Sequence, residues 1–348
     1  MPHILSIQSH VSYGYVGNRA ATFPLQLLGW DVDAVNTVNY SNHAGYRNFT
    51  GTKVTPADLH GMLSTLEDNG MMGQEYILTG YTPDARSLSI VEAYIQRIKQ
   101  ASHATYLLDP VMGDNNRLYV DSDTVPVYKS MLKLADIITP NGFEVELLTG
   151  VALNTRGDIK NALDVLHNSY GVPHVVISSV ELELEPEIGG GNTKPEHGEI
   201  IKPTILSTII SSSTLNSFNS FNSFNTSNTQ TRILQYPLIE GNFNGVGDIF
   251  SALLLANCES SARNVRGVIE IDTLTSATEK TVGSIQAVLN NTRNYAASIL
   301  PENIDDIVEN DQSNSSRIWR QRVRELRLVQ SQDEIKAPRI LHRATEFV

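Results

Sequence analysis

The stretch Tyr106-Leu107-Leu108-Asp109-Pro110-Val111-Met112-Gly113-Asp114 decides the fold, because a short apolar run leads directly into an acidic, glycine-bearing turn. Such a run is typical of a strand buried in a parallel sheet, and Asp109 then stands at its carboxyl end. Open α/β sheets bind their ligands at this end of the strands. The stretch therefore predicts a parallel sheet with a polar site at its edge.

Similar apolar runs recur along the chain and alternate with segments of helical period. The expected strands are 3–8, 31–38, 75–79, 104–109, 136–139 and 174–179. Thr55 and Pro56 form an N-cap and first helical residue, and Ile90, Tyr94 and Ile98 lie on one stripe of a helix. Further helices are expected from 249, near 275–299 and near 317–328. This alternation predicts an α/β fold with a mostly parallel, doubly wound central sheet and right-handed crossovers.

The composition describes a globular chain with a negative net charge. Its 348 residues are 41% hydrophobic and 18% charged, and 26 basic against 38 acidic residues give a formal charge of -12. This charge repels a phosphate backbone, so general binding of nucleic acid is excluded. A local pocket for one small anion stays open, because net charge does not report on a single site.

Cysteine usage and the apolar pattern indicate the compartment. Cys258 is the only cysteine, so the chain has no internal disulfide and no multi-cysteine metal site. Neither a secretion signal nor an apolar run long enough to cross a bilayer is found. We therefore expect a protein of the cytoplasm or the nucleus, without a membrane partner.

A run of Ser, Thr and Asn interrupts the mixed composition. Between residues 207 and 231, 18 of 25 residues are of these types, none is charged, and Ser-Phe-Asn repeats three times at 217–225. These residues compete with regular backbone hydrogen bonding and offer few large side chains to offset the entropy of ordering. We expect one domain over 1–348 with a disordered insertion at 205–232. The alternative is a loop that serves modification or docking.

A glycine turn, Gly245-Val246-Gly247-Asp248, stands directly before the apolar run 249–255. Glycine lets the backbone approach a ligand closely, and the free N–H groups of a helix N-terminus favour an anion. The turn is therefore suited to hold a phosphoryl group while Asp248 accepts the proton of an attacking hydroxyl. The plainer alternative, which these four residues alone favour, is that Asp248 only caps the helix.

Asp109 and Asp114 form the acidic part of the turn quoted above. Two carboxylates beside a polyphosphate suit Mg²⁺, which takes one or two protein oxygens and fills its shell with water and phosphate oxygens. The alternative, equally compatible with these residues alone, is a proline turn with two solvated aspartates.

Other strand ends carry polar residues at the same edge of the sheet, where they can contribute to the site. They are Thr139, Asn141, Glu144, Ser178 and Ser179. The alternative is that each belongs to a turn or caps a helix. A glycine-bearing turn at 9–18 follows the first strand, and 41–46 ends the second. Tyr81 can stack on an aromatic ligand, although a single Tyr is more often a core or surface residue.

Several chemistries are excluded because their motifs are missing. The chain has no Gly-x-x-x-x-Gly-Lys-Ser/Thr, His-Glu-x-x-His or Gly-x-Ser-x-Gly, which excludes P-loop enzymes and two large hydrolase classes. Ser9 and His10 are adjacent, and adjacent strand residues point to opposite faces, so they do not form a hydrolase pair.

Five motifs in order carry a resemblance to a known family. They are Ser-Ile-Gln-Ser-His-Val at 6–11, Gly-Tyr-Val-Gly-Asn-Arg-Ala-Ala-Thr-Phe-Pro-Leu-Gln at 14–26, Leu-Thr-Gly-Tyr at 78–81, Asp-Pro-Val-Met-Gly-Asp at 109–114 and Gly-Val-Gly-Asp at 245–248. The chain closely resembles the pyridoxal kinase family from residue 3 to Ser331, apart from 185–235 and 259–272. The resemblance implies a ribokinase-like three-layer α/β/α fold and a homodimer. It also implies transfer of the ATP γ-phosphoryl group to the 5′-hydroxyl of pyridoxal, pyridoxine or pyridoxamine.

The resemblance also implies roles for individual residues. Asp248 is the implied base, and Gly245 and Gly247 belong to the implied anion hole. The implied substrate-binding residues are Ser9, Val16, Tyr40, His43, Ala44, Tyr81 and Asp248. The implied ATP-binding residues are Tyr119, Asn141, Glu144, Ser178, Ser179, Ile239, Val246 and Gly247. Asp109 and Asp114 are implied to organise Mg²⁺ or Zn²⁺, and with Thr139 and Ser178 a K⁺ or Na⁺ ion.

Two departures from the family pattern bear on the function. Relatives commonly carry Thr where this chain has Ala44, and again where it has Val246, so two hydroxyls near the ligands are absent. One alternative hypothesis is therefore a vitamin B6-binding or regulatory protein with weak catalysis. Another is a kinase of the same fold for hydroxymethylpyrimidine or a sugar, which Tyr81 and the N-terminal turn fit poorly. The preferred vitamer does not follow from the sequence.

Overall fold

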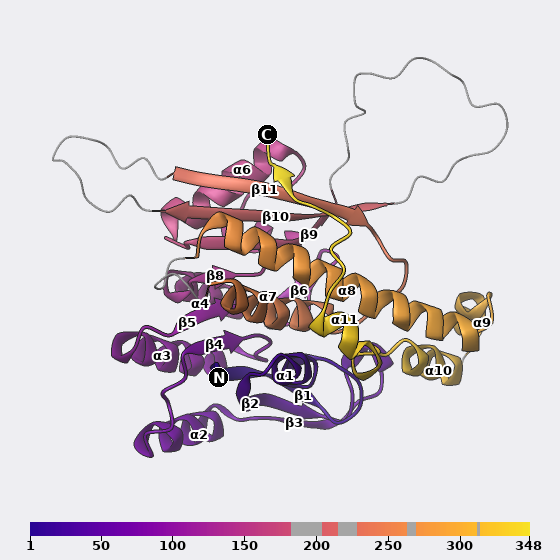
Figure 1. Cartoon of the computed structure of the whole chain (residues 1–348). Helices are drawn as coiled ribbons and strands as arrows, with labels where there is room; N and C mark the ends of the chain where they lie inside the picture. The colour runs from indigo at the N-terminus through magenta and orange to yellow at the C-terminus, as the bar shows by residue number, and fades with distance from the viewer. Residues whose placement is uncertain (182–203, 215–227, 263–268, 312–313) are drawn as a thin grey trace, which may run out of the picture.

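The computed structural model describes residues 1–181, 204–214, 228–262, 269–311 and 314–348. One ten-stranded sheet runs through this part of the chain in the order β12-β11-β10-β9-β8-β5-β4-β1-β2-β3 (Figure 1). The central pairs from β2 to β9 are parallel, and the outer pairs at both edges are antiparallel. The prediction of a mostly parallel α/β fold is confirmed.

The strands of the sheet are β1 (His3–Val11), β2 (Asp31–Tyr40), β3 (Gly51–Lys53), β4 (Tyr76–Thr79), β5 (Thr105–Leu108), β8 (Ile137–Ile138), β9 (His174–Glu181), β10 (Ile205–Thr214), β11 (Asn228–Pro237) and β12 (Thr345–Glu346). A separate two-stranded ribbon consists of β6 (Gly113–Asp114) and β7 (Arg117–Leu118). All six strands expected from the apolar runs are present.

The helices lie on both faces of the sheet and enclose two hydrophobic cores. They are α1 (Gly17–Leu27), α2 (Pro56–Asp68), α3 (Ala85–Ala101), α4 (Thr124–Met131), α5 (Gly142–Thr149), α6 (Arg156–Asp164), α7 (Val246–Ala262), α8 (Ile271–Ile299), α9 (Ile304–Asn310), α10 (Ser315–Val323) and α11 (Gln332–Lys336). Helices α2 to α6 pack on one face, and α1, α7, α8 and α11 on the other. Neighbouring strand residues such as Ile4 and Leu5 alternate between the two cores, which is why the strands read as continuous apolar runs.

The low-complexity segment at 205–232 is the part of the fold for which the sequence-based prediction fails. The prediction of a disordered insertion over 205–232 is wrong for the residues described, because β10 and β11 form a ten-residue antiparallel ladder from Ile205–Pro237 to Thr214–Asn228. Ile209 and Ile210 of β10 are fully buried in opposite cores, and Ile233 and Leu234 of β11 lie in the same two cores at no more than 3% exposure. The Ser-Phe-Asn repeat at 217–225 lies outside the described residues. The burial of these apolar side chains stabilises the two strands by more than the low β-propensity of Ser and Asn destabilises them.

Two further elements differ from expectation. The acidic turn continues into the β6–β7 ribbon, whose connecting residues Asn115 and Asn116 both have positive φ, as a two-residue hairpin turn requires. The Asn-Asn pair was the available signal. The amphipathic helix expected near 317–328 ends earlier, because α10 stops at Val323 and the chain then turns toward α8.

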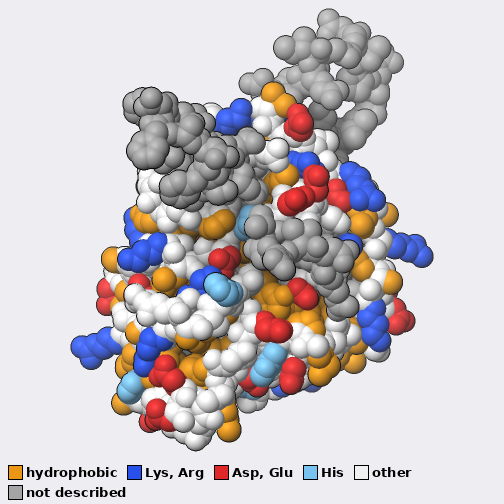
Figure 2. All heavy atoms as spheres, turned by 60° about the vertical axis from the view of Figure 1, so that its left-hand side comes forward, with side chains coloured by type: hydrophobic (Ala, Val, Ile, Leu, Met, Phe, Trp, Pro, Cys, Tyr) orange, Lys and Arg blue, Asp and Glu red, His pale blue; other side chains and the backbone are white. Residues whose placement is uncertain are grey.

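The surface carries charges of both signs. Figure 2 shows Lys and Arg side chains standing apart from one another on the face it draws, with acidic and hydrophobic side chains between them. In the described part of the chain, no helix combines the length and the apolarity that crossing a membrane takes.

The role of β10 as a core strand is testable by mutation. Ile210→Ala removes a fully buried side chain, and we expect it to lower the free energy of unfolding by about 2–5 kcal/mol. Ser213→Ala, at a half-buried position on the same strand, is the control, with an expected effect below about 0.5 kcal/mol. Equal and negligible effects of both variants in chemical denaturation would contradict the strand assignment.

Candidate active site

The candidate site lies where the parallel strands end. Backbone hydrogen bonds continue the sheet ladder past the last strand residues, from Gly80 N to Ile7 O (3.1 Å), Asp109 N to Thr79 O (2.9 Å) and Thr139 N to Leu108 O (3.2 Å). Ser178 N donates to Pro140 O at 2.9 Å in the same way. Because β1 pairs with β2 on one side and β4 on the other, the strand order reverses at this point of the sheet. The polar strand ends predicted from the sequence therefore lie in a row along the carboxyl edge of the sheet, on the β4 side of the switch point.

Asp109 connects the sheet to the helix that follows the glycine turn. Its side chain is 4% exposed, and its Oδ2 accepts a hydrogen bond from Ser251 Oγ of α7 at 3.0 Å. Ser251 Oγ also lies 2.8 Å from Thr139 Oγ1. This buried chain of contacts fixes the second turn of α7 beside the carboxyl ends of β5 and β8.

Glu144 holds the acidic turn against the start of α5. Its Oε1 accepts from Met112 N and its Oε2 from Asn141 N, both at 2.9 Å, and Gly113 N–H is a further donor. Asn141 closes the capping box with Glu144 N and donates from Nδ2 to Gly113 O at 2.8 Å. Both residues, predicted to contact ATP, therefore shape the loop that carries Asp109 and Asp114.

Asp248 lies in the first turn of α7, as the glycine motif predicted. Its carboxylate accepts a hydrogen bond from the backbone N–H of Gly17, at the start of α1. Gly245 has φ +82°, and a Cβ there would lie 2.0 Å from Tyr15 O, so only glycine allows this approach. Asp248 is thus more than a local cap: two helix N-termini and the 13–17 loop meet around it.

The site gathers carboxylates without basic partners. Burial, Glu144 and Asp248 raise the pKa of Asp109 well above its usual range. Burial raises the pKa of Asp248 and raises that of Glu144 to about 7. Among the ion pairs of the described residues, none involves these three side chains. Such a cluster favours a bound cation, because a positive charge relieves both the repulsion and the lost hydration.

The residues predicted to bind an aromatic substrate lie at the ends of β1, β2 and β4. Ser9 is buried at a register shift of β1, and Val16 is the N-cap of α1. Tyr81 follows β4 and is half-buried. Burial and, to a lesser extent, the nearby Tyr40 raise the pKa of Tyr81 to about 12. Its hydroxyl therefore stays neutral, and its ring offers a flat apolar face.

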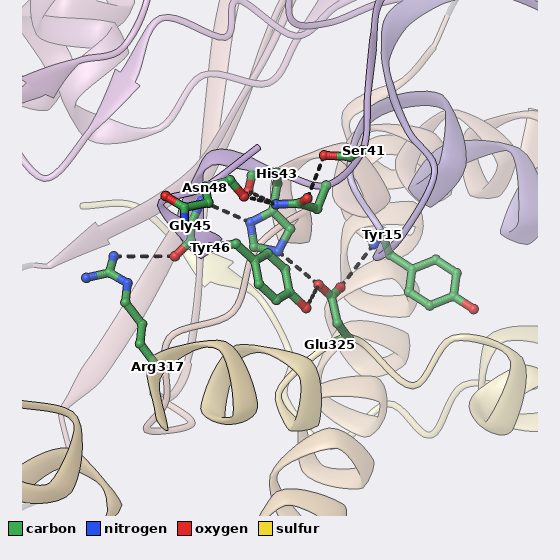
Figure 3. A network of polar contacts seen from close by, with 9 residues as sticks. Tyr15, Ser41, His43, Gly45, Tyr46, Asn48, Arg317 and Glu325 are labelled. Carbon is green, nitrogen blue, oxygen red and sulfur yellow. Dashed lines mark hydrogen bonds and ion pairs between the residues drawn. The ribbon is translucent and has the colours of Figure 1, made fainter. Parts of the chain in front are cut away.

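His43 and Ala44 belong to a short 3₁₀ turn that follows β2. His43 caps this turn, since its Nδ1 accepts from Gly45 N at 3.2 Å, and its Nε2 lies 3.0 Å from Glu325 Oε1 (Figure 3). Ala44 is exposed and has no side-chain polar group to offer a ligand. Both ring nitrogens of His43 are engaged within the protein, so its contact with a substrate runs through the ring face or the backbone.

The remaining predicted ATP contacts are spread along one side of the site. Tyr119 is 53% exposed directly after β7, and its N–H donates to Met112 O at 3.1 Å. Ser178 and Ser179 lie half-buried on β9, and Val246 begins α7. Ile239 is buried, with 6% exposure, between β11 and α7. These roles stay predictions.

The donor set fits one of the predicted metals better than the other. Asp114 is exposed, and its Oδ1 accepts from its neighbour Asn115 N at 2.7 Å, while Asp109 is the buried carboxylate. In the chain as described, no three His, Cys, Asp or Glu side chains form a ready metal cage. Mg²⁺ fits oxygen donors completed by phosphate, whereas Zn²⁺ prefers His and Cys. Thr139 and Ser178 form separate hydrogen bonds, to Ser251 Oγ and Pro140 O, and among the side-chain hydrogen bonds of the described residues none joins the two.

Sequence reasoning missed two residues of this site, Ser251 and Glu325, and it included Gly17 only within the turn at 9–18 and the motif at 14–26. Each acts on a partner far away in the chain, and Glu325 is 282 residues from His43. The apolar run 249–255 hid Ser251 among core residues, and nothing local marked Glu325.

The fold and the site define a ribokinase-like kinase: a parallel sheet ending in a carboxylate cluster, faced by a glycine turn at a helix N-terminus. A family model described as phosphomethylpyrimidine kinase matches residues 72–189. The chain is 36% identical to human pyridoxal kinase over 348 residues, covering 98% of this chain and 97% of that protein. It is 35% identical to pyridoxal kinase of Bos taurus over 355 residues, with 98% and 97% covered.

A solved structure gives the same result in three dimensions. Pyridoxal kinase from Leishmania donovani in complex with ADP and pyridoxamine matches with a TM-score of 0.76 and 30% identity, and the match covers 99% of both chains. The chain therefore belongs to the pyridoxal kinase family. The resemblance drawn from the five motifs is confirmed.

The raised pKa of Glu144 predicts a specific pH dependence of stability without metal or nucleotide. Its carboxyl binds a proton more tightly in the folded than in the unfolded state, so its contribution is largest at acid pH and is lost as the pH rises toward 7. Wild type should therefore lose stability relative to Glu144→Gln between pH 5 and 7, by at most about 1.4 kcal/mol per pH unit. Denaturant titrations of both proteins measure this slope. A difference that stays constant with pH would refute the shifted pKa.

Proposed function

We propose that this chain transfers the γ-phosphoryl group of ATP to the 5′-hydroxyl of pyridoxal, pyridoxine or pyridoxamine. The observation that carries the proposal is the position of Asp248. It lies in the first turn of α7, directly after the glycine turn, and it accepts a hydrogen bond from Gly17 at the end of the 13–17 loop. The full-length identity to human pyridoxal kinase and the ADP and pyridoxamine named for the Leishmania structure support the substrate assignment.

Asp248 acts on the attacking hydroxyl. The substrate oxygen forms a bond to the γ-phosphorus, the bond from phosphorus to the bridging oxygen of ADP breaks, and the hydroxyl proton passes to Asp248. An ordinary Asp pKa of about 3.9 is too low to ionise an alcohol beforehand, so the proton moves late, as the hydroxyl becomes acidic. Burial raises the pKa of Asp248 and thereby improves its match to this step.

The glycine turn stabilises the transferred group. The backbone N–H groups at the start of α7 are not used within the helix, and together with the helix dipole they favour the negative equatorial oxygens. Val246 keeps this backbone N–H although it lacks a hydroxyl. Ser251 links Asp109 to α7 and thereby holds the glycine turn in a fixed position relative to the carboxyl end of β5.

Mg²⁺ is the proposed metal, with Asp109 as its main protein contact. When bound, it neutralises phosphate charge and orients the polyphosphate. Asp109 and Glu144 then supply the negative charge that attracts it to this edge of the sheet. A K⁺ or Na⁺ ion near Thr139 and Ser178, a homodimeric state and a location in the cytoplasm or nucleus remain predictions from the resemblance.

The first prediction concerns the base. Asp248→Asn keeps the size and an acceptor for Gly17 N–H, and we expect it to lower kcat by about 10²–10⁴-fold with unchanged Tm. Product formation from pyridoxal, ATP and Mg²⁺ measures it. Asp333→Asn, an exposed site on α11, is the matched control and should keep wild-type turnover. Wild-type turnover by Asp248→Asn would show that Asp248 is not the base.

The second prediction concerns the metal. Asp109→Asn should raise the Mg²⁺ concentration for half-maximal turnover by about tenfold or more. Asp114→Asn should shift it less, because Asp114 is exposed and bonds within its own turn. Mg²⁺ titrations of activity at saturating ATP compare the two. A larger shift for Asp114→Asn would reverse the assignment of the main ligand.

A further inference from the structure

The Glu325 carboxylate joins two loops that are far apart in the sequence. Its Oε1 accepts hydrogen bonds from Tyr46 OH at 2.8 Å and His43 Nε2 at 3.0 Å, and its Oε2 accepts from Tyr15 N at 3.1 Å (Figure 3). The side chain is only 11% exposed. A single carboxylate thus binds three donors, one from the loop after β1 and two from the turn after β2.

These contacts determine the form of His43. Its Nδ1 accepts from Gly45 N, so the proton of the neutral ring is on Nε2 and is donated to Glu325. Burial and the hydrogen bond to Glu325 raise the pKa of Tyr46, so its hydroxyl remains a donor. The carboxylate therefore selects one tautomer and one orientation of the ring.

The first of the two loops touches Glu325 and the catalytic turn at the same time. A Cβ at Gly14 would lie 2.5 Å from Glu325 Oε1, and the backbone of Tyr15 lies against Gly245. Val16 and Gly17 follow, and Gly17 donates to Asp248. Glu325 therefore positions the loop that continues through Val16 into α1 and borders the vitamer site, whereas the catalytic end of this loop is held separately by Gly245 and Asp248.

The segment that carries Glu325 is itself anchored. Arg317 of α10 donates from Nη2 to Gly45 O at 3.3 Å, on the other side of the same turn. Beyond Glu325, Arg327 N donates to Thr292 Oγ1 of α8 at 3.0 Å. The C-terminal segment therefore holds the two loops against the long helix α8 and limits their movement.

We propose that Glu325 is a positioning residue that sets the affinity for the B6 vitamer by holding the 13–16 and 43–46 loops together; this inference rests on the proposed function. The hydrogen-bond partners of the Glu325 carboxylate in the described chain are Tyr15, His43 and Tyr46, and Asp248 is not among them. Its effect is on the loops that bind the vitamer, so it acts on ground state and transition state alike. Loss of the carboxylate then raises KM for the vitamer and leaves kcat and KM for ATP nearly unchanged.

The test is the kinetics of Glu325→Gln. The amide keeps the size but turns one acceptor oxygen into a donor, so at least one of the three N–H or O–H donors loses its acceptor. We expect KM for pyridoxal to rise about tenfold, with kcat and KM for ATP within about twofold. Tyr46→Phe removes one donor and leaves the carboxylate, and should raise KM for pyridoxal by about threefold. Glu302→Gln, an exposed acidic position, is the matched control.

Each outcome decides. An unchanged KM for pyridoxal in Glu325→Gln overturns the inference, and so does a general loss of kcat and of both affinities together with a lowered Tm, which is the signature of a purely structural role. Should Glu325→Gln not fold, Tyr46→Phe decides, and an unchanged KM for pyridoxal overturns it. A wild-type protein without turnover of any vitamer refutes the proposed function itself, whereas active wild type with an unaffected Glu325→Gln refutes only the role of Glu325.

Discussion

The backbone ladder at the carboxyl edge of the sheet is the constraint on which the site depends. Parallel pairing continues one residue past β4, β5 and β8, so Gly80, Asp109 and Thr139 are held at hydrogen-bonding register with their neighbours. Side chains from remote parts of the chain are thereby placed together by main-chain bonds. Burial of a carboxylate is unfavourable because the group loses its hydration. The backbone hydrogen bonds and the contact with Ser251 nevertheless hold Asp109 at a buried position.

The site gathers three carboxyl groups without a paired cation in the described chain, which suits it to bind a metal ion. Asp109 and Glu144 are buried and Asp248 is half-buried, and no ion pair of the described chain involves them. Loss of hydration raises the pKa of all three carboxyl groups. A bound metal ion would supply the missing positive charge, and the polyphosphate would accept hydrogen bonds from the free N–H groups of α7. Glu325, by contrast, accepts hydrogen bonds from three donors, and its role is to position two loops rather than to bind a cation.

The sequence allowed much of the fold to be predicted, because buried parallel strands and amphipathic helices leave periodic signals. The same local signals identified Asp109, Glu144 and Asp248, which follow strands or open helices. They were misleading for β10, because Ile209 and Ile210, between Thr208 and Ser211, are too few to mark a strand in a segment of this composition. Only the packing of the two side chains in the cores shows that the segment is a strand. The local signals were silent on Ser251 and Glu325, because a residue whose partner lies 142 or 282 positions away carries no local pattern.

The most direct test of the account is a competition among acceptors with the purified wild-type protein. Pyridoxal, hydroxymethylpyrimidine and a simple sugar are offered together with ATP and Mg²⁺, and the phosphorylated products are separated and quantified. The account predicts pyridoxal 5′-phosphate as the main product, formed in equal amount with ADP. Phosphorylation of the pyrimidine or the sugar in preference to pyridoxal, or vitamer binding without ADP formation, would contradict it.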